Sequence, residues 1–268
     1  MAAAVLLAVS VTPGAFTVDR LPVRVLPDGD TLARAAADDA AATVRDAIAR
    51  RGVANVMFAS GKSQLGLLAA LAAAPALDWQ RVVGFHMDEY VGLGGRHRAS
   101  LRRYMRELVA RPLGIGAFHY LDGAAADVGD EARRYAALLR EHQLDLCCLG
   151  IGENGHLAFN DPPVADFDDP LDVKVASLDD ASRRQQVGEG HFAAVDDVPT
   201  HAITVTIPAL LRARRVLAVV PEARKAEPVR GALAGPVSTA CPASILRRQA
   251  HAVLYLDRES ASLLGRAA

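Results

Sequence analysis

Short apolar runs alternate with longer segments of helical periodicity along most of this 268-residue chain. The apolar runs predict strands at residues 21–26, 53–59, 81–87, 144–149, 173–176, 201–207, 215–220 and 252–256. Helices are expected at 31–51, 64–74, 100–110, 129–143, 208–212 and 222–233, the last bent or broken at Pro228. Because strands that alternate with helices are joined by crossovers, the pattern predicts an α/β fold with a mostly parallel sheet, covered on both faces.

The first 20 residues stand apart from this pattern. Residues 2–11 are apolar, but Arg20 is the first basic residue, so the basic region that opens a secretory signal is missing. The apolar run is also too short to cross a bilayer. We interpret residues 1–20 as an N-terminal extension or as the result of a misplaced start codon, with a secretory signal as the alternative. Residues 21–268 show no break in composition and are expected to form one domain.

The charge and the cysteines narrow the class of protein. A net charge of −1 gives no general attraction to nucleic acid or to an anionic membrane, so any anionic ligand must be held by local groups. Cys147 and Cys148 lie in an expected buried strand, and with Cys241 they indicate core residues of a cytoplasmic protein rather than a disulfide framework. No His or Cys spacing matches a metal site, so no metal is expected. A homo-oligomer is compatible with the sequence.

The densest group of chemically active residues is GIGENGHLAFNDPP at residues 150–163, directly after an apolar run. Its three glycines within six residues prevent a regular helix and allow a tight turn. The segment carries side chains that can accept, move or orient protons, among them Asn154, His156 and Asp161. Loops that follow a central strand usually build the sites of open α/β sheets, so we predict an active-site loop. An ordinary polar connection is the alternative.

A second glycine-containing turn, ASGKSQ at residues 59–64, lies between an expected strand and an expected helix. Free backbone N–H groups at such a turn favour an anion, and the candidate ligands are Ser60, Gly61, Lys62 and Ser63. The turn is not a nucleotide-binding P-loop, because Val56 replaces the glycine that such a loop requires. It therefore suits a single phosphate group, with a plain strand-to-helix turn as the alternative.

Two adjacent acids, Asp88 and Glu89, follow the apolar run 81–87. Their position at a strand end would bring both carboxylates to the carboxyl edge of the sheet, beside the two glycine turns. One of them could act as a general base while its neighbour orients a partner. The alternative is a strand-end turn with solvated acids.

Further cations could bind a phosphate. The chain has 30 Lys and Arg, of which only three are Lys, and Lys225 falls at an expected helix start. Its compact ammonium suits a phosphate, although a solvated helix face explains it as well. Arg183 is a further candidate, in the irregular stretch 161–200 that is dense in Asp, Pro and Gly. That stretch would serve as a lid or an active-site loop.

Together, GFHMDEYVGL (84–93) and GIGENGHLAFNDPP (150–163) resemble the glucosamine-6-phosphate isomerase/deaminase family, from about residue 21 to the C-terminus. ASGKSQ resembles the phosphate loop of that family, and ARKA at 223–226 resembles its second phosphate contact. The related 6-phosphogluconolactonases share the turn before the histidine but usually have Asp-Glu-Arg where this chain has Asp-Glu-Tyr, which favours the deaminases. The resemblance implies a three-layer α/β/α Rossmann-like sandwich and no metal or redox cofactor.

The resemblance also implies an activity and roles for individual residues. The substrate would be a small sugar phosphate, glucosamine 6-phosphate, converted to fructose 6-phosphate and ammonia. Asp88 matches the base that moves the C2 proton toward C1, and His156 matches the group that opens the sugar ring. Asp161 stands where many members place a Glu that holds this histidine, and Asn154 stands where some have Asp. Glu89 remains a further catalytic candidate.

Two alternatives follow from the same resemblance. The chain could be a hydrolase of the 6-phosphogluconolactonase type. It could also be a sensing domain that binds a sugar phosphate without turnover, although such domains usually carry a helix-turn-helix that 20 residues are too few to contain. The preferred epimer, an allosteric effector and the oligomer size stay open.

Overall fold

The fold is built around an eight-stranded sheet with the order β1-β2-β11-β10-β7-β3-β4-β6. The structure is a computed structural model that describes residues 13–75 and 77–265. The strands of this sheet are β1 (Gly14–Val18), β2 (Leu21–Leu26), β3 (Ala54–Phe58), β4 (Val82–His86), β6 (Ala117–His119), β7 (Leu146–Leu149), β10 (Arg215–Val220) and β11 (Ala252–Asp257). All neighbouring pairs are parallel except β1 and β2, so the predicted α/β fold with a mostly parallel sheet is confirmed.

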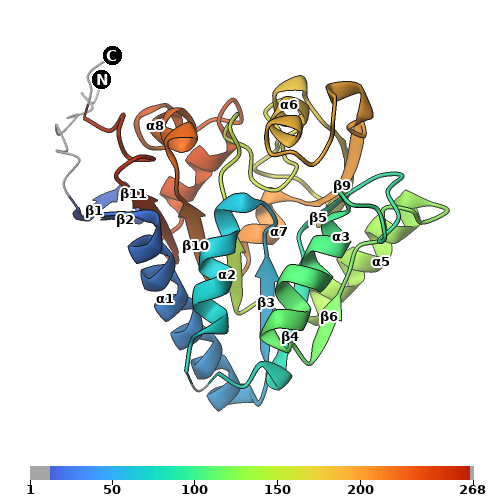
Figure 1. Ribbon diagram of the computed structural model, residues 1–268, viewed down its shortest axis with the longest axis horizontal. Helices are drawn as coiled ribbons and strands as arrows, with labels where there is room; N and C mark the ends of the chain where they lie inside the picture. The colour runs from blue at the N-terminus through green and yellow to red at the C-terminus, as the bar shows by residue number, and fades with distance from the viewer. Residues whose placement is uncertain (1–12, 76, 266–268) are drawn as a thin grey trace.

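Helices cover both faces of this sheet (Figure 1). They are α1 (Gly29–Arg51), α2 (Leu65–Ala72), α3 (Leu101–Tyr104), α4 (Arg111–Leu113), α5 (Val128–Glu141), α6 (Asp180–Gly188), α7 (Ile207–Leu211) and α8 (Ala226–Ala234). Short 3₁₀ segments lie at Lys62–Gln64, Trp79–Arg81, Val195–Asp197, Ala223–Lys225 and Pro242–Arg248.

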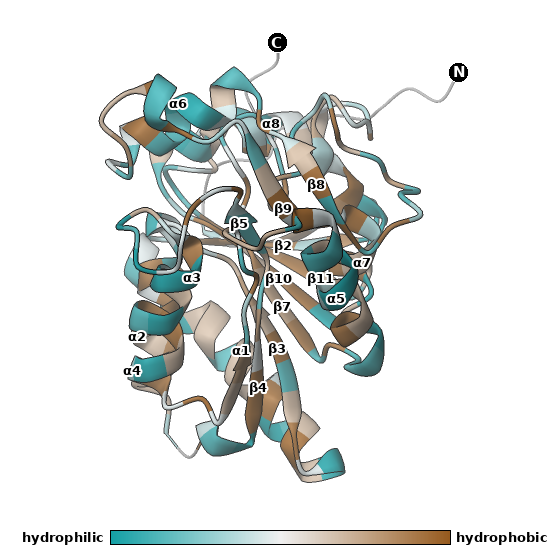
Figure 2. Cartoon of the chain, turned by 90° about the vertical axis from the view of Figure 1, so that its right-hand side faces the viewer, coloured by the Kyte–Doolittle hydropathy of each residue, from teal (hydrophilic) through white to brown (hydrophobic). Residues whose placement is uncertain are grey.

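Alternation along the strands supplies a separate core to each face. Val56 and Phe58 of β3 pack with α1 and α2 on one face, whereas Met57 between them packs with α5, α7 and α8 on the other. Successive side chains of a strand point to opposite faces, so one apolar run serves both layers. In Figure 2 the central strands are largely hydrophobic, whereas hydrophilic residues gather on the outer sides of the helices.

Local signals in the sequence set the ends of the longest helix. The carboxylate of Asp28 accepts a hydrogen bond of 2.7 Å from the backbone N–H of Thr31 and so caps the start of α1. Gly52 ends the helix with φ of 80°, a left-handed conformation that a glycine adopts without a steric penalty. The expected helix over 31–51 therefore begins and ends close to its predicted bounds.

A second, smaller sheet of order β5-β9-β8 packs beside the carboxyl ends of the large one. Its antiparallel strands are β5 (Asp88–Tyr90), β9 (His201–Val205) and β8 (Val173–Ser177). The expected turn after residue 87 is therefore a strand, in which Asp88 pairs with Thr204 of β9. The sequence did not indicate this, because three residues with two acids carry no strand periodicity. Tyr90 is fully buried and lies against Phe159 and Phe192, which secures β5 in place.

The first strand lies inside the stretch that we expected to precede the domain. β1 pairs antiparallel with β2, and Phe16 and Val18 pack against the core, so the sheet begins at residue 14. The ion pair of Asp19 with Arg247 further fastens the turn between β1 and β2. The apolar run at residues 2–11, for which a secretory signal was the alternative, lies outside the described residues.

Other expectations are refined by the structure. The helix expected over 100–110 is α3 continued by a π-helical segment, Met105–Ala110, and by α4. Pro228 does not bend a helix, because it lies in the first turn of α8, where its missing N–H would have no partner in the helix. The stretch 161–200 contains α6 in addition to the expected strand. Across the part of the chain that the structure describes, no helix is long and apolar enough to cross a membrane.

Candidate active site

One cavity gathers the segments that follow four neighbouring strands of the large sheet, in the order β10, β7, β3 and β4. Six predicted site residues line it, namely Ser60, Gly61, Ser63, Asp88, His156 and Lys225. Carboxyl ends of parallel strands meet at one edge, which is where open α/β sheets place their sites. The structure therefore brings together residues from four distant stretches of the sequence. The remaining predicted residues lie outside the lining of the cavity.

The glycine-rich turn after β7 is shaped to hold an imidazole. A Cβ on Gly152 would lie only 2.2 to 2.4 Å from ring atoms of His156, so this position must be glycine for the ring to pack there. Gly155 has φ of 84°, and a Cβ there would lie 2.8 Å from the sulfur of Cys241. The two glycines thus serve different needs, a close approach at one and a left-handed turn with a close approach at the other.

A buried chain of polar groups orients His156 from behind. Its Nδ1 lies 2.9 Å from Oδ1 of Asp161, whose side chain is fully buried. Asn154 donates from Nδ2 to Asp161 at 3.0 Å, and the backbone N–H of Asp179 donates to Asp161 at 3.1 Å. Burial would raise the pKa of Asp161, but the hydrogen bond and the charge of His156 outweigh it and lower that pKa. An ionised Asp161 holds Nδ1 and leaves Nε2 for proton exchange.

Asp88 supplies a carboxyl group of unusual basicity. The residue is 6% exposed, and its Oδ1 has no hydrogen-bond partner among the described residues. Burial, followed by the charge of Glu89, raises the pKa of Asp88 to about 8. A carboxyl with this pKa is a far stronger base than a solvated one and can exchange protons near neutral pH.

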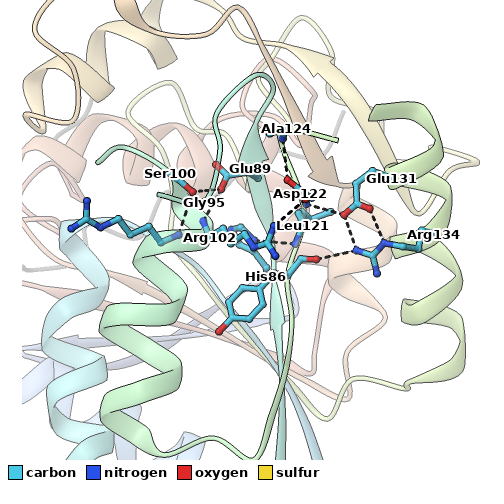
Figure 3. Close-up of polar contacts among 12 residues, drawn as sticks. His86, Glu89, Gly95, Ser100, Arg102, Leu121, Asp122, Ala124, Glu131 and Arg134 are labelled. Atoms are coloured by element: carbon cyan, nitrogen blue, oxygen red, sulfur yellow. Dashed lines mark hydrogen bonds and ion pairs between the residues drawn. The ribbon is translucent and has the colours of Figure 1, made fainter. Parts of the chain in front are cut away.

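Glu89 is not part of the cavity, and its role differs from that of a catalytic candidate. Its carboxylate accepts hydrogen bonds from Ser100 Oγ at 2.7 Å and from the backbone N–H groups of Leu101 and Arg102 at 3.1 and 2.7 Å. It therefore caps the start of α3, as Figure 3 shows. Arg102 continues the network by an ion pair of 3.1 Å with Asp122. Glu89 thus fixes the loop behind Asp88.

The turn after β3 forms part of the predicted phosphate cradle. Gly61 has φ of 107°, and its carbonyl accepts a hydrogen bond from Tyr104 at 2.9 Å. Lys62 does not join Ser60, Gly61 and Ser63 in the cavity, because its exposed side chain lies in a separate groove beside the start of α1. Of the candidate ligands in this turn, those that line the cavity offer backbone and hydroxyl groups.

Lys225, which follows β10, lines the same cavity and is the predicted cation of the cradle. It is 3% exposed and precedes α8 directly. No ion pair or hydrogen bond of its ammonium occurs within residues 13–75 and 77–265. Burial, and then the charge of Arg224, lowers the pKa of Lys225. An ammonium held in this way favours an anionic ligand.

Arg183 is not brought to the cavity. Its guanidinium donates to the carbonyls of Val195 and Val198 at 2.6 and 3.2 Å and lies near Asp180. It therefore braces α6 against the segment that follows. The sequence offered it only as a cation in an irregular stretch, and the helix that turns it away was not predicted.

Residues that the sequence analysis missed line the side of the cavity formed by the end of α6. They are Gln185, Gln186, Glu189 and His191, from the end of α6 and the turn after it. No sequence motif marks them, since two amides, one acid and one histidine form no known pattern. Their only signal was the helix start at Asp179, whose carboxylate accepts from the N–H of Ser182 at 2.7 Å. Within the described residues, no three His, Cys, Asp or Glu side chains are grouped so as to hold a metal ion.

Comparisons with known proteins agree with this site. Residues 27–169 match the family described as glucosamine-6-phosphate isomerases/6-phosphogluconolactonase. A curated glucosamine-6-phosphate deaminase of Exiguobacterium sibiricum is 38% identical over 209 residues, which is 77% of this chain and 80% of that protein. A second, of Bacillus thuringiensis, is 36% identical over 210 residues, 78% of each chain.

Solved structures resemble the fold along most of its length. A monomeric glucosamine-6-phosphate deaminase has a TM-score of 0.81 at 30% identity and covers 90% of this chain and 99% of its own. The 6-phosphogluconolactonase of Trypanosoma brucei has a TM-score of 0.73 at 18% identity, covering 94% of this chain and all of its own, a likeness of fold alone. The chain belongs to the glucosamine-6-phosphate isomerase/6-phosphogluconolactonase family.

Proposed function

We propose that this protein is a glucosamine-6-phosphate deaminase, which converts its substrate to fructose 6-phosphate and ammonia. The observation that carries the proposal is that a buried, unpaired carboxyl (Asp88) and a carboxylate-held imidazole (His156) line the same cavity as a phosphate cradle. The three parts match the needs of the reaction, which are a base at C2, an acid–base group at the ring oxygen and an anchor for the phosphate. Relatives at 36–38% identity carry this activity in their names.

The first step falls to His156. The phosphate of the substrate binds the turn at 60–63 and Lys225, which positions the sugar between the two proton-transfer groups. With Asp161 on Nδ1, the Nε2 atom of His156 can take the proton of the C1 hydroxyl and deliver it to the ring oxygen. The ring C–O bond breaks and an open-chain 2-amino aldehyde forms.

The second step falls to Asp88. Its carboxylate removes the proton from C2, and the electron pair forms an enolamine with the former aldehyde. The same carboxyl then returns the proton to C1, which leaves an iminium at C2. Water adds at C2, the C–N bond breaks and ammonia leaves, so the ketose 6-phosphate is formed without any net redox change. A base with pKa of about 8 suits removal of a carbon-bound proton better than an ordinary carboxylate.

We infer that the protein acts in the cytoplasm. Cys147 and Cys148 are fully buried free thiols in β7, and Cys241 is also free, as expected for a chain that needs no disulfides. Hydrolysis of a lactone is less well supported, because the relatives at 36–38% identity are named as deaminases, whereas the likeness to a lactonase is one of fold at 18% identity.

The test is release of ammonia and of fructose 6-phosphate from glucosamine 6-phosphate by the purified protein, in stoichiometric amounts. In deuterated water, deuterium should enter C1 of the ketose or C2 of recovered substrate. Asp88→Asn keeps size and polarity but removes the base, so turnover and exchange should fall about 10²–10⁴-fold. Hydrolysis of 6-phosphogluconolactone without ammonia release would point to the lactonases instead. Binding without any turnover would point to a sensing domain.

A further inference from the structure

An ionised carboxylate lies against the phosphate cradle. Glu189 lines the cavity, and its Oε2 is 4.0 Å from the position that a Cβ on Gly61 would occupy. Burial alone would raise the pKa of Glu189, but hydrogen bonds from His191, Arg224 and Gln185 outweigh it and bring the pKa to about 2. A phosphate dianion and this carboxylate would repel each other strongly in a partly desolvated cradle.

Three side chains hold Glu189 in this position, and only one of them, Arg224, comes from a distant part of the chain. Gln185 donates to its Oε1 at 3.0 Å and His191 lies 3.4 Å from its Oε2, but both belong to the same stretch of chain. Arg224, from the residues just before Lys225, donates to Oε1 at 2.8 Å. The same Nη1 atom also donates to Glu153 at 3.1 Å. Arg224 therefore connects Glu189, at the end of α6, with Glu153 in the glycine-rich turn after β7.

The backbone around Glu189 is suited to local movement. Gly188 and Gly190 flank it, and a Cβ at either position would meet nothing within 4 Å. Gly190 has φ of 80°, a conformation that favours glycine. The other end of α6 is fastened, because Asn154 donates to Asp179 at 3.0 Å and the N–H of Asp179 donates to Asp161. The carboxyl end is bonded to the same loop, because the backbone N–H of Glu153 donates to Gln185 at 2.9 Å. Movement of Glu189 would therefore take place at its two flanking glycines while α6 stays attached.

We propose that Glu189 is a charge latch, which the phosphate of the ligand must displace from the cradle before the ligand can bind. This deepens the proposed function and rests on it only for the ligand class, a phosphorylated sugar. The latch makes the phosphate group necessary for entry, because a neutral sugar brings no charge to replace the carboxylate near Lys225. Part of the binding free energy of the phosphate is used to break the contact of Glu189 with Arg224, so the apparent affinity is lower than the intrinsic one.

Calorimetric titration with inorganic phosphate and with fructose 6-phosphate tests the latch. Glu189→Gln removes the charge while keeping the shape, and it should bind both ligands about tenfold more tightly or better than wild type. Glu153→Gln is the matched control, since it removes a carboxylate from the same Arg224 but does not line the cavity. The control should stay within about twofold of wild type, because it changes the net charge equally without clearing the cradle.

The competing role for Glu189 is recognition of the amino group of the substrate. In that case, Glu189→Gln would leave inorganic phosphate and fructose 6-phosphate unchanged and would weaken only amino-sugar ligands, which would overturn the latch. Tightening equal to that of Glu153→Gln would also overturn it. Circular dichroism and thermal unfolding check the fold, and Glu189→Ala repeats the titration should the glutamine variant not fold. Since none of these titrations requires turnover, a protein without deaminase activity would still give a result on the latch.

Discussion

At the residue scale, the adjacent acids Asp88 and Glu89 have different surroundings because consecutive side chains of β5 point to opposite sides. Asp88 lines the cavity, and its Oδ1 has no hydrogen-bond partner in the described part of the chain, whereas Glu89 accepts hydrogen bonds at the start of α3. In a strand, successive side chains point to opposite sides, so β5 directs Asp88 to the cavity and Glu89 to the start of α3. Gly152 shows a second effect of a single residue, because its lack of a side chain leaves room for the imidazole ring of His156.

Gly152→Ala should lower kcat by about 10²-fold or more with little loss of fold, because an added Cβ would displace the His156 ring from its working position. Gly94→Ala is the control, since a Cβ there meets nothing within 4 Å and the residue has no positive φ. Steady-state kinetics and thermal unfolding of both variants make the comparison. An unchanged kcat in Gly152→Ala would mean that the ring position is not critical for the reaction.

Lys225→Ala should raise KM for the phosphorylated substrate about tenfold or more, because a charge-assisted hydrogen bond contributes roughly 1.5–3 kcal/mol. Lys62→Ala removes an equal charge from the neighbouring turn, but that side chain lies in a different groove. We expect its KM to match wild type. Equal effects of the two variants would indicate a long-range charge effect rather than a contact in the cradle.

At the element scale, the segments that follow parallel strands carry the proposed reacting groups, and short helices fix those segments. The helical stretch that begins with α3 has its first turn fixed by the carboxylate of Glu89 and the hydroxyl of Ser100. α6 fixes another side of the cavity. The backbone N–H of Asp179, at the start of α6, donates to Asp161, and the end of the helix carries Glu189. Both elements stabilise polar backbone groups at the edge of the cavity.

Glu89→Gln should lower the free energy of unfolding by about 1–3 kcal/mol, since an amide offers one acceptor oxygen and leaves buried donors of α3 unsatisfied. Part of the activity should be lost with it, as the loop behind Asp88 loosens. Urea denaturation measures the stability. Glu107→Gln, on the exposed side of the neighbouring π-helical segment, serves as the control and should change it little. A fully stable Glu89→Gln variant would refute the capping role.

At the scale of the whole molecule, the junction of the two sheets creates the site and imposes a cost in stability. β4 belongs to the large sheet and β5 to the small one, so the chain crosses between them at Met87, immediately before Asp88. The crossing buries the carboxyl group and raises its pKa to about 8. Basicity for the reaction is thus obtained by placing an acid where its charged form is unfavourable.

Stability should consequently depend on pH through Asp88. Above the pKa of the unfolded chain, the folded protein keeps the Asp88 proton that the unfolded chain loses, so stability falls as pH rises toward the folded pKa of about 8. Asp88→Asn removes this dependence. Its gain in unfolding free energy over wild type should grow by on the order of 2–3 kcal/mol between about pH 5 and about pH 7.5.

Urea denaturation across this pH range measures the difference, with Asp130→Asn as an exposed control. For activity the sign is the reverse, because the base must be ionised, so kcat/KM should rise with pH toward about 8. A stability difference between Asp88→Asn and wild type that does not change with pH would show that Asp88 titrates as an ordinary carboxyl.

The sequence by itself determined the alternation of strands and helices, the mostly parallel sheet, and the two turns that carry Gly61 and His156. Those features depend on periodicity and on glycine, which act within a few residues and can be read locally. The tertiary structure alone decided that Lys62 and Arg183 lie outside the cavity, that Glu89 caps a helix, and that Glu189 lines the cavity. The direction of a side chain and the pKa of a buried acid depend on elements far away in the chain, which come together only when the two sheets pack.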